Sequence, residues 1–185
     1  MKPPYRYFND DSIEEVDLIA QLRGLAWQKE RLFIYGKWVQ VPREVAFYGD
    51  KGVSYTYSNV CHQGLGWPPI LRRLREKAQQ LAQQRFNSVL LNYYHDGNDY
   101  MGWHSDDEAV LGPAPCVAML SLGATRDFVF RLKADPSNKH SVALTHQHWL
   151  IMLPPTQALW QHTLPKRKNI QQARISLTFR LILPV

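Results

Sequence analysis

The second half of the chain consists of short apolar segments, several of them alternating with polar residues, which is the pattern of β-strands. We expect strands at residues 88–94, 116–122, 127–132, 140–144, 149–153 and 173–183. Turn-forming residues separate them, for example Gly112-Pro113, residues 135–138 and Pro154-Pro155. Many short strands in succession, after two helices, predict a sandwich or jelly roll flanked by helices.

The first half of the chain contains two segments with helical periodicity. Ser12 and Glu15 form a capping box, and the apolar spacing that follows predicts a helix over residues 12–25, closed by Gly24. A second helix begins at Pro68-Pro69. Its expected buried stripe is Ile70, Leu74, Ala78 and Leu81, and its basic residues, which we expect on a solvated face, are Arg72, Arg73, Arg75 and Lys77.

Two further segments of the first half read as strand pairs or strands. Residues 31–35 and 38–41 predict a hairpin that turns at Gly36, and Pro42 ends its second strand. Residues 53–58 are rich in β-prone side chains. The expected class is therefore mostly β with flanking helices (α+β).

Length and composition favour a single domain covering residues 1–185, because 185 residues with 45% hydrophobic content can bury a core without cross-links. Within it we place the helices and hairpins in residues 1–86 and the sheet core in residues 87–185. Cys61 and Cys116 stand far apart without a Cys-x-x-Cys motif, so the sequence signals neither a disulfide framework nor a zinc site. We therefore expect the protein in a reducing, intracellular compartment. The start has no apolar h-region and no segment is long enough to span a bilayer.

The net charge of +6 and the pI near 9.4 favour a polyanionic partner such as nucleic acid. Basic residues cluster in the second helix and at residues 166–168. Many basic proteins bind no nucleic acid, so charge alone leaves this partner open.

The strongest chemical signal lies at residues 91–108, where a buried strand leads to His104 and Asp106. Side chains two apart in an extended strand point the same way, so both can bind one cation. A His-x-Asp pair alone is weak, since such pairs arise by chance. A third ligand candidate, His162, completes two histidines and one carboxylate, the facial triad of non-haem Fe(II) oxygenases. His146 and His148 share one strand face and are alternatives to His162.

The last predicted strand carries its polar side chains on one face. Arg174, Ser176, Thr178 and Arg180 alternate with apolar residues, so two guanidinium groups point inward among hydroxyls. Inward-facing arginines require an anion, which a dicarboxylate cosubstrate would supply.

Aromatic residues of the first half are candidates for contacts to bases. Tyr35 and Lys37 flank Gly36 at the tip of the predicted hairpin, where they suit a wedge that stacks on bases and meets phosphate, or an ordinary exposed turn. Tyr55 and Tyr57 share one strand face, where they suit stacking on a planar base or packing in the core.

Several motifs taken together resemble the AlkB family of Fe(II)- and 2-oxoglutarate-dependent dealkylating dioxygenases, over residues 32–183. They are Asn92-Tyr93-Tyr94 with Asp96-Gly97, and residues 102–108, 126–131, 160–165 and 174–180. Residues 35–37, 48–50 and 55–58 resemble the branch whose nuclear animal members act on duplex DNA. The resemblance implies a double-stranded β-helix (jelly roll) core.

The resemblance also implies roles for individual residues. The iron ligands, and thus the catalytic residues, would be His104, Asp106 and His162. The contacts to 2-oxoglutarate would be Asn92, Tyr94, Arg174, Ser176, Thr178 and Arg180, and the contacts to the substrate would be Tyr35, Gly36, Lys37, Tyr55, Tyr57 and Asp107. Tyr57 would sandwich a flipped base against His104, Asp107 would contact that base, and Tyr35 would intercalate.

Two residues depart from the family pattern. Ser176 stands where many members carry Asn, and Gln147 stands where Gly is common. The first departure changes how the cosubstrate is held, and the second changes a turn. Neither affects the three ligand candidates.

The implied activity is oxidative demethylation of 1-methyladenine and 3-methylcytosine in DNA, with RNA as an alternative substrate. Fe(II), 2-oxoglutarate and O2 would take part, and formaldehyde and succinate would be released, which reverses alkylation damage directly. We expect a monomer without membrane contact, in the cytosol of a bacterium or the nucleus of a eukaryote. The rival hypotheses are an Fe(II)/2-oxoglutarate oxygenase acting on protein, lipid or a metabolite, and a non-catalytic nucleic-acid-binding sandwich.

Overall fold

The structure is a computed structural model that describes residues 1–10, 18–34, 36–57 and 60–184, with the side chains of residues 32–34 and 57 left out. Its helices are α1 (Leu18–Arg23), α2 (Pro69–Ala82), the short 3-10 helix η1 (Ala109–Leu111) and α3 (Thr156–Leu159). Its strands are β1 (Tyr5–Asn9), β2 (Arg31–Ile34), β3 (Lys37–Gln40), β4 (Glu44–Gly49), β5 (Ser54–Tyr57), β6 (Val60–Gln63), β7 (Ser88–Tyr94), β8 (Met101–His104), β9 (Val117–Gly123), β10 (Arg126–Leu132), β11 (Lys139–Leu144), β12 (His148–Met152), β13 (Trp160–Leu164) and β14 (Arg174–Arg180).

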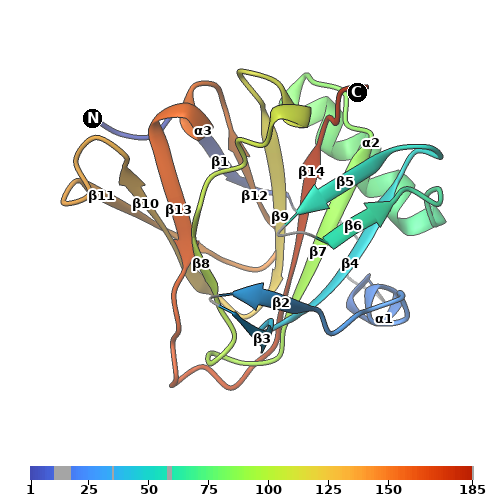
Figure 1. Cartoon of the computed structure of the whole chain (residues 1–185), viewed down its shortest axis with the longest axis horizontal. Coiled ribbons are helices and arrows are strands. Elements are labelled where there is room, and N and C mark those ends of the chain that lie inside the picture. Colours follow the sequence, from blue (N-terminus) through green and yellow to red (C-terminus); the bar gives the residue numbers. More distant parts are fainter. Residues whose placement is uncertain (11–17, 35, 58–59, 185) are drawn as a thin grey trace.

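Two antiparallel sheets face each other across a common core (Figure 1). In the part of the chain that is described, the larger sheet has six strands in the order β1-β12-β9-β14-β7-β4, and the smaller has four in the order β11-β10-β13-β8. The residues packed between them come from both sheets, including Met119 and Leu150 from the larger and Phe130 and Val142 from the smaller. This arrangement confirms the predicted jelly roll.

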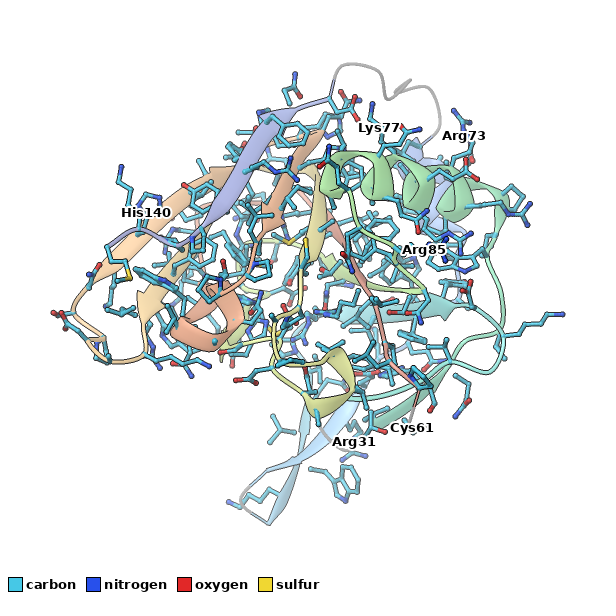
Figure 2. The ribbon with its side chains drawn as sticks, turned by 90° about the horizontal axis from the view of Figure 1, so that it is seen from above. Arg31, Cys61, Arg73, Lys77, Arg85 and His140 are labelled. Carbon is cyan, nitrogen blue, oxygen red and sulfur yellow. The ribbon has the colours of Figure 1, made fainter. Side chains whose placement is uncertain are left out.

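A second apolar core lies between the outer face of the larger sheet and the helices α1 and α2. Helix α2 buries Leu71, Leu74, Ala78 and Ala82, so its stripe is rotated slightly from the one that we predicted, with Ile70 and Leu81 only partly buried. Figure 2 shows Arg73 and Lys77 on α2, pointing away from the sheet. Of the predicted first helix, the described part is α1, and its capping box lies outside the described residues.

The larger sheet draws strands from both halves of the chain. β1 pairs with β12, and β4 pairs with β7, so two strands from residues 1–86 lie in the same sheet as strands from residues 87–185. β1, β4, β6 and β13 were not predicted as strands. β1, β4 and β13 are short strands whose pairing with partners distant in the sequence stabilises them, and β6 pairs with the preceding strand β5.

Two hairpins lie outside the two main sheets, β2–β3 at the bottom of the view and β5–β6 at its right (Figure 1). β2 and β3 form the predicted hairpin, with pairs from Arg31 and Gln40 to Ile34 and Lys37, and β5 pairs with β6. Among the described helices none has the length and apolar character that crossing a membrane requires.

Candidate metal centre and cosubstrate pocket

A pocket opens between the two sheets on the inner faces of β7, β8, β13 and β14. Strand β14 alternates as predicted, with Ile175, Leu177 and Phe179 in the core against α2 and its polar side chains facing the pocket. The pocket is lined by Leu90, Asn92, Tyr94, Met101, His104, Asp106, Met119, Phe128, Met152, His162, Leu164, Arg174, Ser176, Thr178 and Arg180. All nine residues that we assigned to the metal and to 2-oxoglutarate therefore share one cavity.

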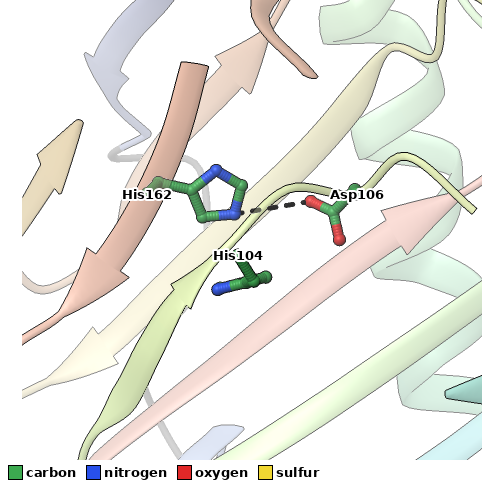
Figure 3. A group of neighbouring side chains, drawn as sticks. All are labelled: His104, Asp106 and His162. Atoms are coloured by element: carbon green, nitrogen blue, oxygen red, sulfur yellow. Dashed lines mark ion pairs between the residues drawn. The ribbon is translucent and has the colours of Figure 1, made fainter. Parts of the chain in front are cut away.

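His104, Asp106 and His162 meet at one side of this pocket (Figure 3). Each offers a ligand atom, and these atoms lie within 4.8 Å of one another. His104 is the last residue of β8 and is paired in register with His162 of β13, so strand pairing brings the two imidazoles together. Asp106 lies just beyond the end of β8 rather than within it, yet it still faces the histidines. Within the described residues this is the single group of its kind.

The donor atoms of these three side chains fit a metal ion. The Nδ1 atom of His104 lies 2.9 Å from the carbonyl oxygen of Gly102, which it contacts as a donor, so Nε2 is left as the unprotonated nitrogen. Asp106 Oδ2 is buried without a hydrogen-bond partner among the described residues. It lies 3.6 Å from His162 Nε2, which is too long for a hydrogen bond and suits two ligands of one ion.

The electrostatics of the group favour the protonation states that bind metal. Burial, followed by the neighbouring His104, lowers the pKa of His162 to about 3, and burial also lowers the pKa of His104. Burial alone would raise the pKa of Asp106, but the Arg180 guanidinium and the two histidines outweigh it and lower that pKa to about 2. At neutral pH the group therefore presents two neutral imidazoles and one carboxylate.

Arg180 and Arg174 occupy different environments, although we expected both to bind an anion. Arg180 donates from Nε (3.0 Å) and Nη2 (2.5 Å) to Asp106 Oδ1, so it binds the carboxylate of a ligand candidate directly. Arg174 has no carboxylate partner in the described residues, donates to Ser121 Oγ at 3.0 Å and leaves its buried Nη2 without a hydrogen-bond partner. Arg174 is therefore the guanidinium with a donor to spare for a bound carboxylate.

Asn92 is held by a residue that the sequence analysis missed. Arg43, which is buried, donates from Nε to Asn92 Oδ1 at 2.6 Å and leaves the Asn92 amide nitrogen as the group available to a ligand. Phe128 was also missed, although the alternation of its strand turns it inward, where its ring stacks on His162 with centroids 5.0 Å apart.

The predicted substrate contacts are only partly described. Tyr35 and the side chain of Tyr57 lie outside the described residues. Gly36 and Lys37 are exposed at the hairpin tip, and Gly36 has a positive φ of 74°. Tyr55 is 1% exposed, and its hydroxyl donates a hydrogen bond to Glu108 Oε1 at 3.0 Å. Tyr55 therefore lies in the core, which is one of the two positions that we considered for it.

Asp107 and the remaining histidines also have defined surroundings. The Asp107 carboxylate is half exposed and accepts a hydrogen bond from Lys133 Nζ at 2.9 Å. His146 accepts a hydrogen bond from the Gly123 backbone N–H at its Nδ1, and His148 Nδ1 lies 2.6 Å from Thr145 Oγ1. Neither histidine belongs to the group of ligand candidates. Gln147 has a φ of 57°, a left-handed conformation that explains why Gly is common at this position.

Comparison with known proteins assigns the chain to a family. A model of the 2OG-Fe(II) oxygenase superfamily matches residues 8–180. The chain belongs to this superfamily. The Fe(II), 2-oxoglutarate and O2 expected from the AlkB resemblance are the cofactors of the superfamily, and the residues of the pocket fit them.

Relatives within the superfamily confirm the resemblance to AlkB proteins. The chain is 42% identical to mouse (Mus musculus) DNA oxidative demethylase ALKBH2 over 82% of its own length and 66% of the relative. It is 44% identical to the human (Homo sapiens) ALKBH2 over 83% and 61%, and 40% identical to human alpha-ketoglutarate-dependent dioxygenase alkB homolog 3 over 93% and 63%. The chain thus spans less than two thirds of the length of these relatives.

A solved structure shows the same fold. The structure of OsALKBH1 superimposes with a TM-score of 0.64 over 97% of this chain and 99% of that one, at 16% sequence identity. At this identity the likeness concerns the fold alone.

Proposed function

We propose that the chain is an Fe(II)- and 2-oxoglutarate-dependent dioxygenase that removes N-methyl groups from bases in DNA, with 1-methyladenine and 3-methylcytosine as substrates. The observation that carries this proposal is the meeting of His104, Asp106 and His162 beside a pocket with a buried, incompletely bonded Arg174. Relatives that are 40–44% identical and named as DNA demethylases or alkB homologues support the substrate.

Each group in the pocket has a defined task in this proposal. His104 Nε2, Asp106 Oδ2 and His162 Nε2 would hold the iron, and Arg180 would keep the Asp106 carboxylate ionised and fixed. The Arg174 guanidinium and the Asn92 amide would bind the carboxylates of 2-oxoglutarate. Bound iron, 2-oxoglutarate and O2 supply the oxidation of the N-methyl carbon, one oxygen atom entering that carbon and the other entering succinate as CO2 leaves.

The hydroxylated carbon then separates from the base without a protein nucleophile. The C–N bond breaks, the electron pair stays on the ring nitrogen, which takes up the hydroxyl proton, and formaldehyde leaves. The protein has to bring the methyl group to the iron and exclude competing substrates. A base must leave the duplex to reach a buried site, and methylation of its pairing edge lowers the energy that this step requires.

The recognition of DNA belongs to the two hairpins in this proposal. The β2–β3 hairpin presents exposed Lys37 and the 60%-exposed Trp38, and a cation and an aromatic ring suit phosphate and base. Tyr35, Tyr57 and Asp107 remain proposed contacts from the family resemblance.

The decisive experiment compares substrates of different classes. The full chain, supplied with Fe(II), 2-oxoglutarate and O2, is incubated with methylated single- and double-stranded DNA, methylated RNA and a methylated peptide, and the products are read by mass spectrometry. The expected result is unmodified base in DNA with formaldehyde and succinate in equal amounts, and none with His104→Ala.

The rival functions give different results in the same assay. Demethylation of RNA or peptide without demethylation of DNA would assign the enzyme to another substrate class. Binding of DNA without any conversion of 2-oxoglutarate to succinate would favour the non-catalytic nucleic-acid-binding protein. As to setting, we propose a monomer in a reducing compartment, in keeping with free Cys61 and Cys116.

A further inference from the structure

The backbone of Asp106 is held by a side chain that has no role in the function proposed so far. Strand β8 ends at His104, so the N–H of Asp106 has no partner in the sheet. Gln157 Oε1 accepts a hydrogen bond from this N–H at 2.9 Å, in a fully buried position. A buried backbone N–H requires such a partner, and here a residue 51 positions away supplies it.

Gln157 belongs to the segment that also carries the third ligand. It lies in α3, and the next element along the chain is β13, which presents His162. Ser105 Oγ donates to the carbonyl oxygen of Trp160 at 3.2 Å, which attaches the residue before Asp106 to the same segment. The segment that carries His162 therefore also forms hydrogen bonds with Ser105 and with the backbone of Asp106.

Lys133, the residue after β10, reinforces this attachment. Its Nζ donates to the backbone carbonyl of Gln157 at 2.8 Å and to Asp107 Oδ2 at 2.9 Å. One ammonium group thus joins α3 to the residue after Asp106. Ser105, Asp106 and Asp107 are each bonded to α3, to the start of β13 or to Lys133.

The chemistry of Gln157 is unusual for a residue that only fills space. Its side chain is 1% exposed, and its amide nitrogen has a sulfur atom, Met152 Sδ at 3.5 Å, as its recorded partner. Sulfur is a weak acceptor, so burying this amide costs free energy that an apolar side chain of the same size would not. The hydrogen bond from the Asp106 backbone N–H to Gln157 Oε1 offsets this cost.

We propose that Gln157 is a positioning residue of the metal centre. Arg180 fixes Asp106 Oδ1 and Gln157 fixes the Asp106 backbone, so that Oδ2, the oxygen left free, is set at its place beside His162 Nε2. This inference rests on the ligand set of the proposed function. It predicts that removing the Gln157 acceptor weakens metal binding although no ligand is changed.

The test measures metal affinity rather than turnover. The full chain is titrated with Co²⁺ in the presence of 2-oxoglutarate, and binding is followed by the visible absorption of cobalt. Gln157→Leu keeps the approximate volume and removes the acceptor, and we expect its dissociation constant to rise by about 10- to 100-fold, the usual effect of losing a partner that orients a ligand.

Gln161→Leu is the matched control. Gln161 lies next to His162 on β13, but it faces the other side of the sheet, where its Oε1 accepts a hydrogen bond from Arg131 Nε at 2.9 Å. We expect this variant to bind Co²⁺ within about twofold of the unchanged protein. Circular dichroism establishes that each variant is folded at the temperature of the titration. If Gln157→Leu does not fold, Lys133→Met, which removes the bond to the Gln157 carbonyl, should raise the dissociation constant by about tenfold.

Two results would overturn the inference. One is a folded Gln157→Leu variant whose dissociation constant for Co²⁺ stays within twofold of that of the unchanged protein, while Asp106→Asn no longer binds Co²⁺. If Gln157→Leu does not fold, the same result with Lys133→Met would count against the inference. The other is an equal loss in Gln161→Leu, which would mean that any change in this strand weakens the site. If the unchanged protein and Asp106→Asn bind Co²⁺ alike, the ligand set itself is wrong, and the proposed function fails with it.

Discussion

Replacing Arg180 by methionine tests how the pocket stabilises the buried, charged side chain of Asp106. Arg180 Nε and Nη2 both donate to Asp106 Oδ1, and the two side chains are 8% and 4% exposed. Without Arg180 the carboxylate would be left buried without its main counter-charge. Breaking a buried pair in this way costs about 3–5 kcal/mol. We therefore expect the free energy of unfolding of the metal-free protein to fall by that amount.

A double-mutant cycle separates the pair from its surroundings. Asp106→Asn removes the charge that Arg180 compensates, so the double variant Arg180→Met/Asp106→Asn should be more stable than the sum of the single effects predicts, by about 2–3 kcal/mol. A divalent ion at Asp106 Oδ2 would also neutralise the carboxylate. Adding Mn²⁺ should therefore return part of the stability that Arg180→Met loses, and none of what the double variant loses.

The measurement is urea denaturation followed by circular dichroism, with chelator and then with Mn²⁺. Arg131→Met is the control, because Arg131 lies on the outer side of the smaller sheet, where it bonds Gln161 and stacks on Trp103 at 4.3 Å. It should cost about 1 kcal/mol. The reasoning is refuted if Arg180→Met costs no more than this control, or if the single effects add up to that of the double variant.

Three further predictions concern the scaffold and the thiols. Gly97→Ala should lower the midpoint of thermal unfolding by about 6–12 °C, because the added carbon would overlap the Arg167 carbonyl oxygen. An unchanged midpoint would mean that the backbone at Gly97 and the backbone at Arg167 move apart without cost. Arg126→Met should lower the urea-derived stability by more than about 3 kcal/mol, since the buried Arg126 donates to three loop carbonyl oxygens, and a loss below 1 kcal/mol would contradict this. Burial raises the pKa of the Cys116 thiol, so less of it is thiolate at pH 8 and its alkylation should accelerate as pH rises. Mass spectrometry should show exposed Cys61 modified first, and earlier modification of Cys116 would contradict its burial.

The sequence predicted those elements whose own pattern is strong. β7 was placed at its observed bounds because residues 88–94 form an almost continuous apolar run, and the alternation along β14 gave both its faces. β1 and β4 were missed because each is an edge strand that pairs with one neighbour, and their own residues give little signal. For such strands the partner decides the structure.

The site divides in the same way. The three ligand candidates carry a local signal in His104 and Asp106, and a family motif around His162. Arg43 and Gln157 carry none, because each is defined by a bond to a residue about fifty positions away, Asn92 and Asp106 respectively. The sequence of one chain does not reveal such pairs, since Asn92 and Asp106 lie in a recognisable motif but nothing around Arg43 or Gln157 indicates their partners. The direction of Arg180, toward Asp106 as well as toward the pocket, was missed for the same reason.

The central claim is that His104, Asp106 and His162 bind one ferrous ion. The measurement that tests it most directly is a crystal structure of the protein grown without oxygen in the presence of Fe(II) and 2-oxoglutarate. The account predicts a single iron with His104 Nε2, Asp106 Oδ2 and His162 Nε2 at bonding distance and the carboxylate of 2-oxoglutarate against Arg174. An iron bound elsewhere, or one that leaves any of these three atoms out of its coordination sphere, would contradict it.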